Sequence, residues 1–262
     1  MIELFDYLGN KAVSWVKYLW GISILLYQSL KAFFTSQKEG QRVVTDVIFR
    51  QILFTGVEAL PVISFVALLL GAIVIVQSIA QFTKFGAEEY LGQVLVLVII
   101  RELGPLLTAV IVIGRSATAI AIELGNMIVD HEMEALKVIG VDHLRFVVAP
   151  RIIGVTITVV CLTIYFCLVA IIGGFIVSRF IMVLPFGVFI EHLLSAATIG
   201  DIFVCFLKSA IFGLLIALIC VFHGLSVKVS STEVPQVTTR AVVSSIFFCF
   251  ALNGIVTVLF YM

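Results

Sequence analysis

Three charged side chains that could bind an anion or carry a proton lie within long apolar stretches of this chain. Arg101 and Glu102 are neighbours inside residues 91–125, and Lys208 lies inside residues 201–224. A charge near the centre of a membrane span costs about 2.5–3.5 kcal/mol on insertion scales. A span that keeps such residues usually has a polar surface or cavity for them to face, which indicates transport.

These charges are predicted to lie at similar depths. With a helical rise of ~1.5 Å per residue, Arg101 is roughly 15 Å and Lys208 roughly 10 Å below the outer surface. Asn253 lies in the same outer half of the last stretch, residues 240–261. One interpretation is a cationic cavity, open outward, that receives an anionic head group.

The alternative is an internal ion pair, Arg101–Glu102 or Lys208–Glu102, that fixes the packing of the helices. Neighbouring helical residues point about 100° apart, so Arg101 and Glu102 are each expected to have their own partner. We favour the cavity over the ion pair, because intramembrane charges usually mark functional sites.

The composition requires that these residues be held by membrane-spanning helices. The 262 residues are 62% hydrophobic and 12% charged, with a mean hydropathy of +1.24. A soluble domain is nearer half apolar and a quarter charged. The apolar stretches are much longer than the ~10 residues of a barrel strand and do not alternate. The expected fold class is an all-α integral membrane protein.

Five stretches are long enough to cross a membrane: residues 58–80, 91–125, 149–178, 201–224 and 240–261. The second exceeds the ~20 residues of a perpendicular span, so it must tilt, kink at Gly104-Pro105 or extend into the cytoplasm. Residues 13–34 are apolar but are interrupted by lysines and rich in aromatic rings, which favours an amphipathic helix in the membrane interface over a sixth span. We therefore predict an N-terminal helical region, residues 1–57, and a five-span domain, residues 58–262.

Basic residues predict the orientation. With the N-terminus in the cytoplasm, eleven lysines and arginines fall on the cytoplasmic side, and only Lys84 and Arg179 fall outside. Cytoplasmic loops carry the excess of basic residues. The C-terminus is then expected at the periplasmic face. The acidic N-terminal segment does not resemble a cleavable signal peptide.

Residues 130–140, between the second and third spans, predict a short cytoplasmic helix. Asp130 can cap its start and Gly140 its end. Two glutamates suit the positive end of the helix dipole, and three apolar residues form one stripe. The stripe could dock into a groove on a partner or rest on lipid, and the pattern leaves both open. The residues concerned are Glu132, Met133, Glu134, Leu136 and Ile139.

The sequence carries no recognisable catalytic set. It has no GxxxxGK[ST] phosphate loop, no HExxH and no GxSxG motif. Five cysteines lie in apolar stretches without metal-ligand spacing, which favours packing roles. We expect a non-enzymatic chain without metal or cofactor, and its zero net charge gives no sign of a nucleic-acid partner.

Two segments carry a family resemblance: RELGPLLTAVIVIGRSATAIAIELGNM, starting at Arg101, and EMEALKVIGVDHLRFVVAPR, ending at Arg151. FLKSAIFG around Lys208 and TTRAVVSS around Arg240 extend it over essentially the whole chain. The chain resembles the MlaE/YrbE permease family, the membrane subunits of Mce-associated ABC transporters.

The resemblance implies a homodimer in a Gram-negative inner membrane, bound to two ATPase subunits that carry the ATP and Mg²⁺. It also implies a periplasmic Mce-domain hexamer, a small STAS-domain protein on the ATPase, and glycerophospholipid as the cargo. Arg101, Glu102, Lys208 and Arg240 match polar positions linked to the lipid cavity. Asn253 departs from an acidic residue found in some members, and residues 130–140 match the helix that docks into the ATPase.

Two alternatives differ in cargo and energy source. The chain could belong to an Mce-type transporter for sterol or another hydrophobic cargo. It could also be an ion-coupled secondary carrier with Glu102 as the proton site, but such carriers often show inverted repeats and none is visible here.

Overall fold

The protein is helical throughout the described part of the chain. The computed structural model describes residues 2–35, 40–82, 90–182, 185–228 and 230–261, so Lys84 and the C-terminal Met262 lie outside the described residues. Within the described residues, five helical runs are long and apolar enough to cross a membrane, which confirms the predicted fold class. They are Gln41–Phe82, Leu91–Val129, Leu144–Ile181, Ile199–Leu225 and Glu233–Phe260.

Each run consists of one or more helical elements. The first contains α2 (Gln41–Gly56), the 3₁₀ turn η1 (Val57–Ala59) and α3 (Leu60–Phe82). The second contains α4 (Leu91–Leu95), η4 (Val96–Leu103), α5 (Gly104–Val112), η5 (Ile113–Ala117) and α6 (Thr118–Val129). The third contains η6 (Leu144–Val148) and α8 (Ala149–Met182), the fourth is α10 (Ile199–Leu225) and the fifth is α11 (Glu233–Tyr261).

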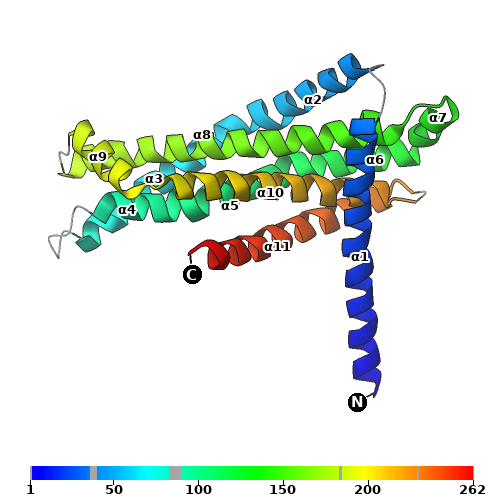
Figure 1. Ribbon diagram of the computed structural model, residues 1–262, viewed down its shortest axis with the longest axis horizontal. Coiled ribbons are helices and arrows are strands. Elements are labelled where there is room, and N and C mark those ends of the chain that lie inside the picture. Colours follow the sequence, from blue (N-terminus) through cyan, green and yellow to red (C-terminus); the bar gives the residue numbers. More distant parts are fainter. Residues whose placement is uncertain (1, 36–39, 83–89, 183–184, 229, 262) are drawn as a thin grey trace.

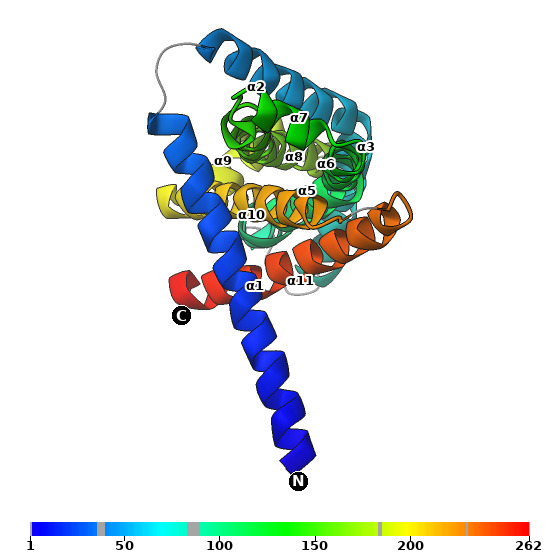
Figure 2. The same cartoon turned by 90° about the vertical axis from the view of Figure 1, so that its right-hand side faces the viewer.

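The spans lie side by side along the long axis of the molecule (Figure 1). The short helix α7 (Glu132–Val138) is at one end, the α7 end, and α9 (Phe186–Ala196) is at the other, the α9 end. Figure 2 shows α10 near the centre of the bundle and α11 at its edge. Accordingly, 56% of the most apolar window of α10 is buried but only 17% of that of α11.

Helix α1 (Ile2–Thr35) runs across the bundle near the α7 end, as Figures 1 and 2 show. Ile22 is buried against the bundle, and the Tyr18 hydroxyl lies 3.1 Å from His223 Nε2 on α10. Trp20 and Tyr27 are exposed. A helix that lies crosswise to the spans, with aromatic rings outward, agrees with the predicted interfacial helix.

Glycines allow α3 and α8 to pack in direct backbone contact. A Cβ at Gly71 would lie 1.9 Å from the carbonyl oxygen of Ala170, and one at Gly173 would lie 2.5 Å from that of Leu68. Small residues at such crossings are the usual means of close helix association in membranes. This contact fixes the first and third spans against each other.

The start of α7 differs from the sequence prediction. Asp130 is not its N-cap, because the Asp130 N–H donates to the Asn126 carbonyl (2.8 Å) and so closes the last turn of α6. The N-cap is His131, whose φ of 59° makes the sharp break between the two helices. Gly140, with φ 78°, is confirmed at the other end, where Val141 N–H donates to the Leu136 carbonyl (2.9 Å).

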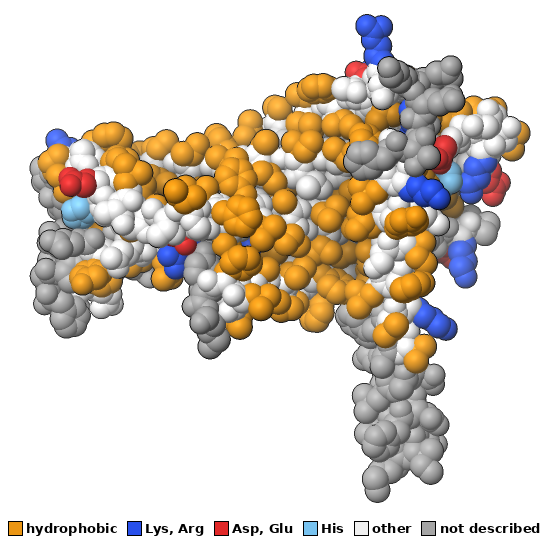
Figure 3. Space-filling model, in the orientation of Figure 1, with side chains coloured by type: hydrophobic (Ala, Val, Ile, Leu, Met, Phe, Trp, Pro, Cys, Tyr) orange, Lys and Arg blue, Asp and Glu red, His pale blue; other side chains and the backbone are white. Residues whose placement is uncertain are grey.

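Side chains of opposite kind occupy different parts of the surface. In Figure 3 hydrophobic side chains cover the middle of the bundle, while most charged ones gather toward its two ends. This distribution is the one expected of a protein whose middle faces lipid.

Candidate functional site

Lys208 on α10 is the centre of a polar cluster within the spans. Its side chain has no solvent exposure. Its ammonium donates to Glu102 Oε1 (3.1 Å), to the Arg101 carbonyl (2.9 Å) and to Thr257 Oγ1 (2.9 Å). An ammonium has three donors, so these contacts satisfy Lys208 completely within the chain.

Glu102 connects three spans. Its Oε1 contacts Lys208 and also lies 2.8 Å from Thr257 Oγ1, and its Oε2 accepts from Asn253 Nδ2 at 2.8 Å. The carboxylate only accepts, which fixes the Asn253 amide with its nitrogen toward Glu102. The Asn253 Oδ1 atom is buried and has no hydrogen-bond partner among the described residues.

Arg101 has a separate partner, as the 100° rotation between neighbouring residues predicts. Its Nε lies 2.7 Å from Asp201 Oδ1 and its Nη2 donates to Oδ2 at 3.1 Å, a bidentate arrangement. Asp201 is also part of a capping box, in which it accepts from Thr198 N–H and the Thr198 hydroxyl at the start of α10. The Arg101–Glu102 alternative is therefore wrong, whereas the Lys208–Glu102 pair is present.

Local backbone geometry explains why Lys208 fits here. Arg101 and Glu102 lie in the π-helical segment η4, and such segments are frequent at functional sites. Pro105 has no N–H, so it cannot donate to the Arg101 carbonyl four residues earlier as other helical residues would. The Lys208 ammonium donates to that carbonyl instead. Gly104 allows α8 to pack closely against the start of α5, because a Cβ there would lie 2.7 Å from Cys167 Sγ on α8.

Two members of the cluster reach the surface. The side chains of Arg101 and Glu102 are 26% and 27% exposed, whereas Lys208 is fully enclosed. Any ligand would therefore meet Arg101 and Glu102 first. Lys208 can act on it only through Glu102 unless the cluster rearranges.

Arg240 does not join this cluster. It is exposed near the start of α11, thirteen residues before Asn253, which is about 20 Å along the helix. Asp201 and Thr257 are members that we did not identify as site residues from the sequence. The Thr198-x-x-Asp201 pattern is a capping-box signal that could have indicated Asp201; Thr257 had no such signal.

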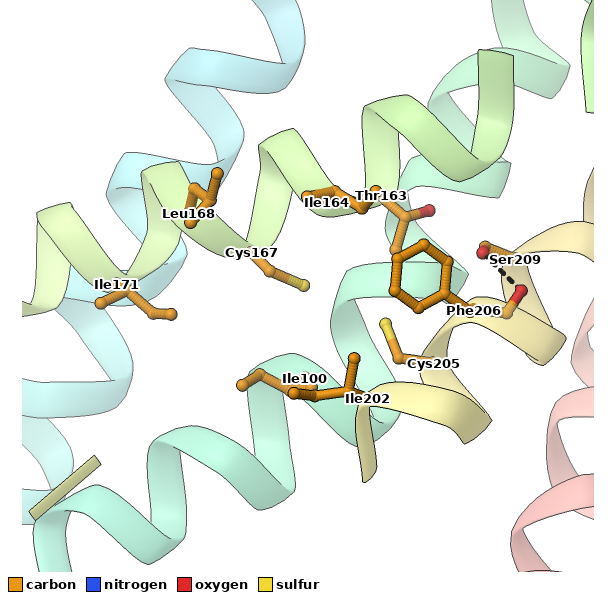
Figure 4. Close-up of a pocket in the computed structure, with 10 residues that line it drawn as sticks. All are labelled: Ile100, Thr163, Ile164, Cys167, Leu168, Ile171, Ile202, Cys205, Phe206 and Ser209. Atoms are coloured by element: carbon orange, nitrogen blue, oxygen red, sulfur yellow. Dashed lines mark hydrogen bonds between the residues drawn. The ribbon is translucent and has the colours of Figure 1, made fainter. Parts of the chain in front are cut away.

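An apolar pocket of about 210 Å³ lies on the same helices. Figure 4 shows its walls on η4, α8 and α10, with Cys167, Cys205 and Phe206 pointing into it. Ile100 and Ile202 in its lining directly precede and follow Arg101 and Asp201 in the chain. A polar cluster and an apolar pocket on shared helices suit an amphipathic ligand.

Helix α7 presents a different apolar surface from the predicted stripe. Met133 is 2% exposed and Leu136 packs against the core of this chain. Val138 and Ile139 are 87% and 71% exposed. The sequence prediction was therefore wrong about which way Met133 faces, because the break at His131 folds α7 back onto the chain. Glu132 and Glu134 remain exposed.

His143, which follows α7, is outside the spans. Partial burial and the nearby Lys137 lower its pKa, against an opposing effect of Asp142. The imidazole is therefore neutral at pH 7 and adds no charge to this end of the molecule.

Comparisons with known proteins agree with this architecture. The family described as "Permease MlaE" matches residues 48–259. A probable ABC transporter permease protein of Rickettsia prowazekii is 31% identical over 82% of this chain and 83% of its own length. One from Synechocystis is 30% identical over 88% and 90%. The intermembrane phospholipid transport system permease protein MlaE of Haemophilus influenzae is 28% identical over 100% and 98%.

Proposed function

Because the chain belongs to the MlaE permease family, we propose that it is the membrane subunit of an ABC transporter that moves glycerophospholipids between the inner and outer membranes of a Gram-negative bacterium. The Haemophilus relative that carries a phospholipid-transport name aligns over the whole chain. The observation that carries the proposal is the buried charged cluster, which lies beside an apolar pocket within the spans.

In this proposal a separate chain hydrolyses the ATP. The sequence has no phosphate loop of its own, so ATP and Mg²⁺ are bound by a partner ATPase. The α7 end is cytoplasmic, in keeping with its basic residues, and exposed Val138 and Ile139 offer the ATPase an apolar contact. A second copy of this chain, a periplasmic Mce-domain hexamer and a STAS-domain protein complete the proposed complex.

The lipid phosphate is received at Arg101, and Glu102 holds the geometry of the site. Asn253 donates to Glu102, and its buried Oδ1 becomes an acceptor for a head-group N–H or O–H only when the cluster rearranges. Lys208 positions Glu102 and neutralises its charge, so that the phosphate does not meet a bare carboxylate. ATP hydrolysis in the partner exposes this cluster alternately to the two sides of the membrane and so transfers the lipid. Arg240 contributes on the cytoplasmic side.

A charge exchange tests the role of Arg101. Arg101→Glu should abolish lipid transfer by the assembled complex and reduce co-purified phospholipid. Arg101→Glu combined with Asp201→Arg restores an ion pair between the same helices, so it should recover thermal stability but not lipid transfer. Recovery of both would assign Arg101 to packing alone. Mass spectrometry of the bound lipid also distinguishes phospholipid from sterol, and sterol as the bound species would contradict the proposed cargo.

A further inference from the structure

A second hollow, of about 510 Å³, lies at the α7 end between α2, α6 and α8. Glu123, one of its lining residues, is 21 residues beyond Glu102 on the second run, which is about 30 Å along a helix. The hollow is therefore separate from the cluster around Lys208. Two walls of the hollow, α2 and α8, are fixed against each other. They pack so tightly that a Cβ at Gly154 on α8 would lie 2.8 Å from Gln51 Cγ on α2.

The hollow combines charges of both signs. The Arg151 side chain is 9% exposed and donates to Glu123 Oε1 at 2.6 Å and to the Val147 carbonyl at 3.0 Å. Glu123 is 58% exposed. The Arg50 side chain is 79% exposed, and its partner Asp46, one turn earlier on the same helix, is also exposed. Ion pairs between exposed side chains contribute little free energy. Arg50 can therefore turn toward a ligand at little cost.

Apolar side chains lie on both sides of Arg50 in the lining of the hollow. Val47 and Phe54 on α2 line it beside Arg50, and Phe54 is 43% exposed. The charged groups thus lie beside an apolar wall on a helix that runs on into the first span. A ligand that fits must carry a charged part and an apolar part.

We propose that this hollow binds the head group of a zwitterionic aminophospholipid in the leaflet at the α7 end. The phosphate contacts Arg50 and Arg151, the primary ammonium contacts Glu123, and an acyl chain lies along Phe54. An anionic lipid without an amine would place its phosphate near the Glu123 carboxylate with no compensating contact. This proposal rests on the proposed function, because the site would bind the transported class of lipid on the cytoplasmic side.

A fluorescence reporter can measure occupancy of this hollow alone. The chain has two tryptophans, Trp15 and Trp20, so replacing both by Phe and introducing Phe54→Trp places one tryptophan at the rim. The full chain is reconstituted in phosphatidylcholine vesicles that contain brominated phosphatidylethanolamine or brominated phosphatidylglycerol. The ratio of quenching by the two lipids gives the head-group preference at this position.

We expect phosphatidylethanolamine to quench severalfold more strongly than phosphatidylglycerol. Arg50→Gln should weaken quenching by both, and Glu123→Gln should remove the preference. Arg42→Gln, an exposed arginine on the same helix outside the hollow, is the control and should leave the ratio unchanged. Because Glu123→Gln also removes the partner of Arg151, Arg50→Gln carries the test if that variant fails to fold.

Equal quenching by the two lipids, or quenching that Arg50→Gln does not change, would overturn the proposal. The result is independent of transport. A preserved preference in a chain whose complex with its ATPase transfers no lipid in the presence of ATP would disprove the proposed function and leave the binding site standing.

Discussion

At the residue scale, the cost of burying Lys208 explains the whole cluster. A buried ammonium is tolerated only when it is paired and its remaining donors are satisfied. Glu102, the Arg101 carbonyl and Thr257 supply those contacts from two other spans. The cluster therefore fixes the rotation of α10 against η4 and α11, whatever it also does to a lipid.

Lys208→Met should lower the free energy of unfolding by about 3 kcal/mol, because it leaves the Glu102 carboxylate without its cation. Glu102→Gln combined with Lys208→Met should be more stable than Lys208→Met alone, since the orphaned charge is removed. Thermal unfolding of the purified protein in detergent measures both. Strictly additive effects would show that the two side chains are not coupled.

At the element scale, the second run depends on small residues where its helix departs from α geometry. Gly104 follows η4, and a Cβ there would lie 2.7 Å from both Cys167 Sγ and the Ile99 carbonyl oxygen. Gly114 lies in η5 and has nothing within 4 Å of its Cβ position. The two glycines thus differ in packing while sharing one helix.

Gly104→Ala should therefore destabilise the protein by about 1–3 kcal/mol through overpacking, whereas Gly114→Ala should be neutral or slightly stabilising. Melting temperatures of the two variants, measured side by side, provide the comparison. The idea fails if Gly104→Ala unfolds at the temperature of the unmodified protein.

The two faces of α7 should also respond differently. Ile139→Asp places a carboxylate in the proposed apolar contact with the ATPase, so it should abolish co-purification of that subunit while the permease still folds. Met133→Asp places the charge in the core of this chain and should reduce the yield of folded permease itself. Retention of the ATPase by well-folded Ile139→Asp protein would remove α7 from the proposed interface.

At the scale of the whole molecule, the basic residues and the crosswise helix predict a cytoplasmic α7 end. Helix α1 lies across the bundle near the α7 end, and α11 runs from that end toward the other (Figure 1). Five spans place the two chain ends on opposite sides if α1 does not cross. The side of the membrane on which the C-terminus lies therefore shows whether α1 crosses.

A periplasm-specific reporter such as alkaline phosphatase, fused after the last residue, should be active, and a reporter that works only in the cytoplasm should be silent there. The same reporters fused within the loop after α7 should give the opposite pattern and serve as the control. A cytoplasmic C-terminus would mean that residues 13–34 cross the membrane.

The amino-acid sequence by itself determined the five spans and the Gly140 cap, and it predicted an interfacial position for α1. Each follows from local properties: the length of an apolar stretch, the placement of aromatic rings and lysines, and the freedom of glycine at positive φ. It also determined that Arg101 and Glu102 would have different partners, because the rotation per residue is a property of any helix.

Only the tertiary structure decided which partners those are. Asp201 and Lys208 lie about a hundred residues from Arg101 and Glu102 along the chain, and hydropathy does not specify the rotation and register that bring α10 against η4. The same reason explains α7, where the break at His131 sets which side chains face inward. An apolar stripe shows that a helix has a face to bury, but whether that face meets its own chain or another depends on how the whole chain packs.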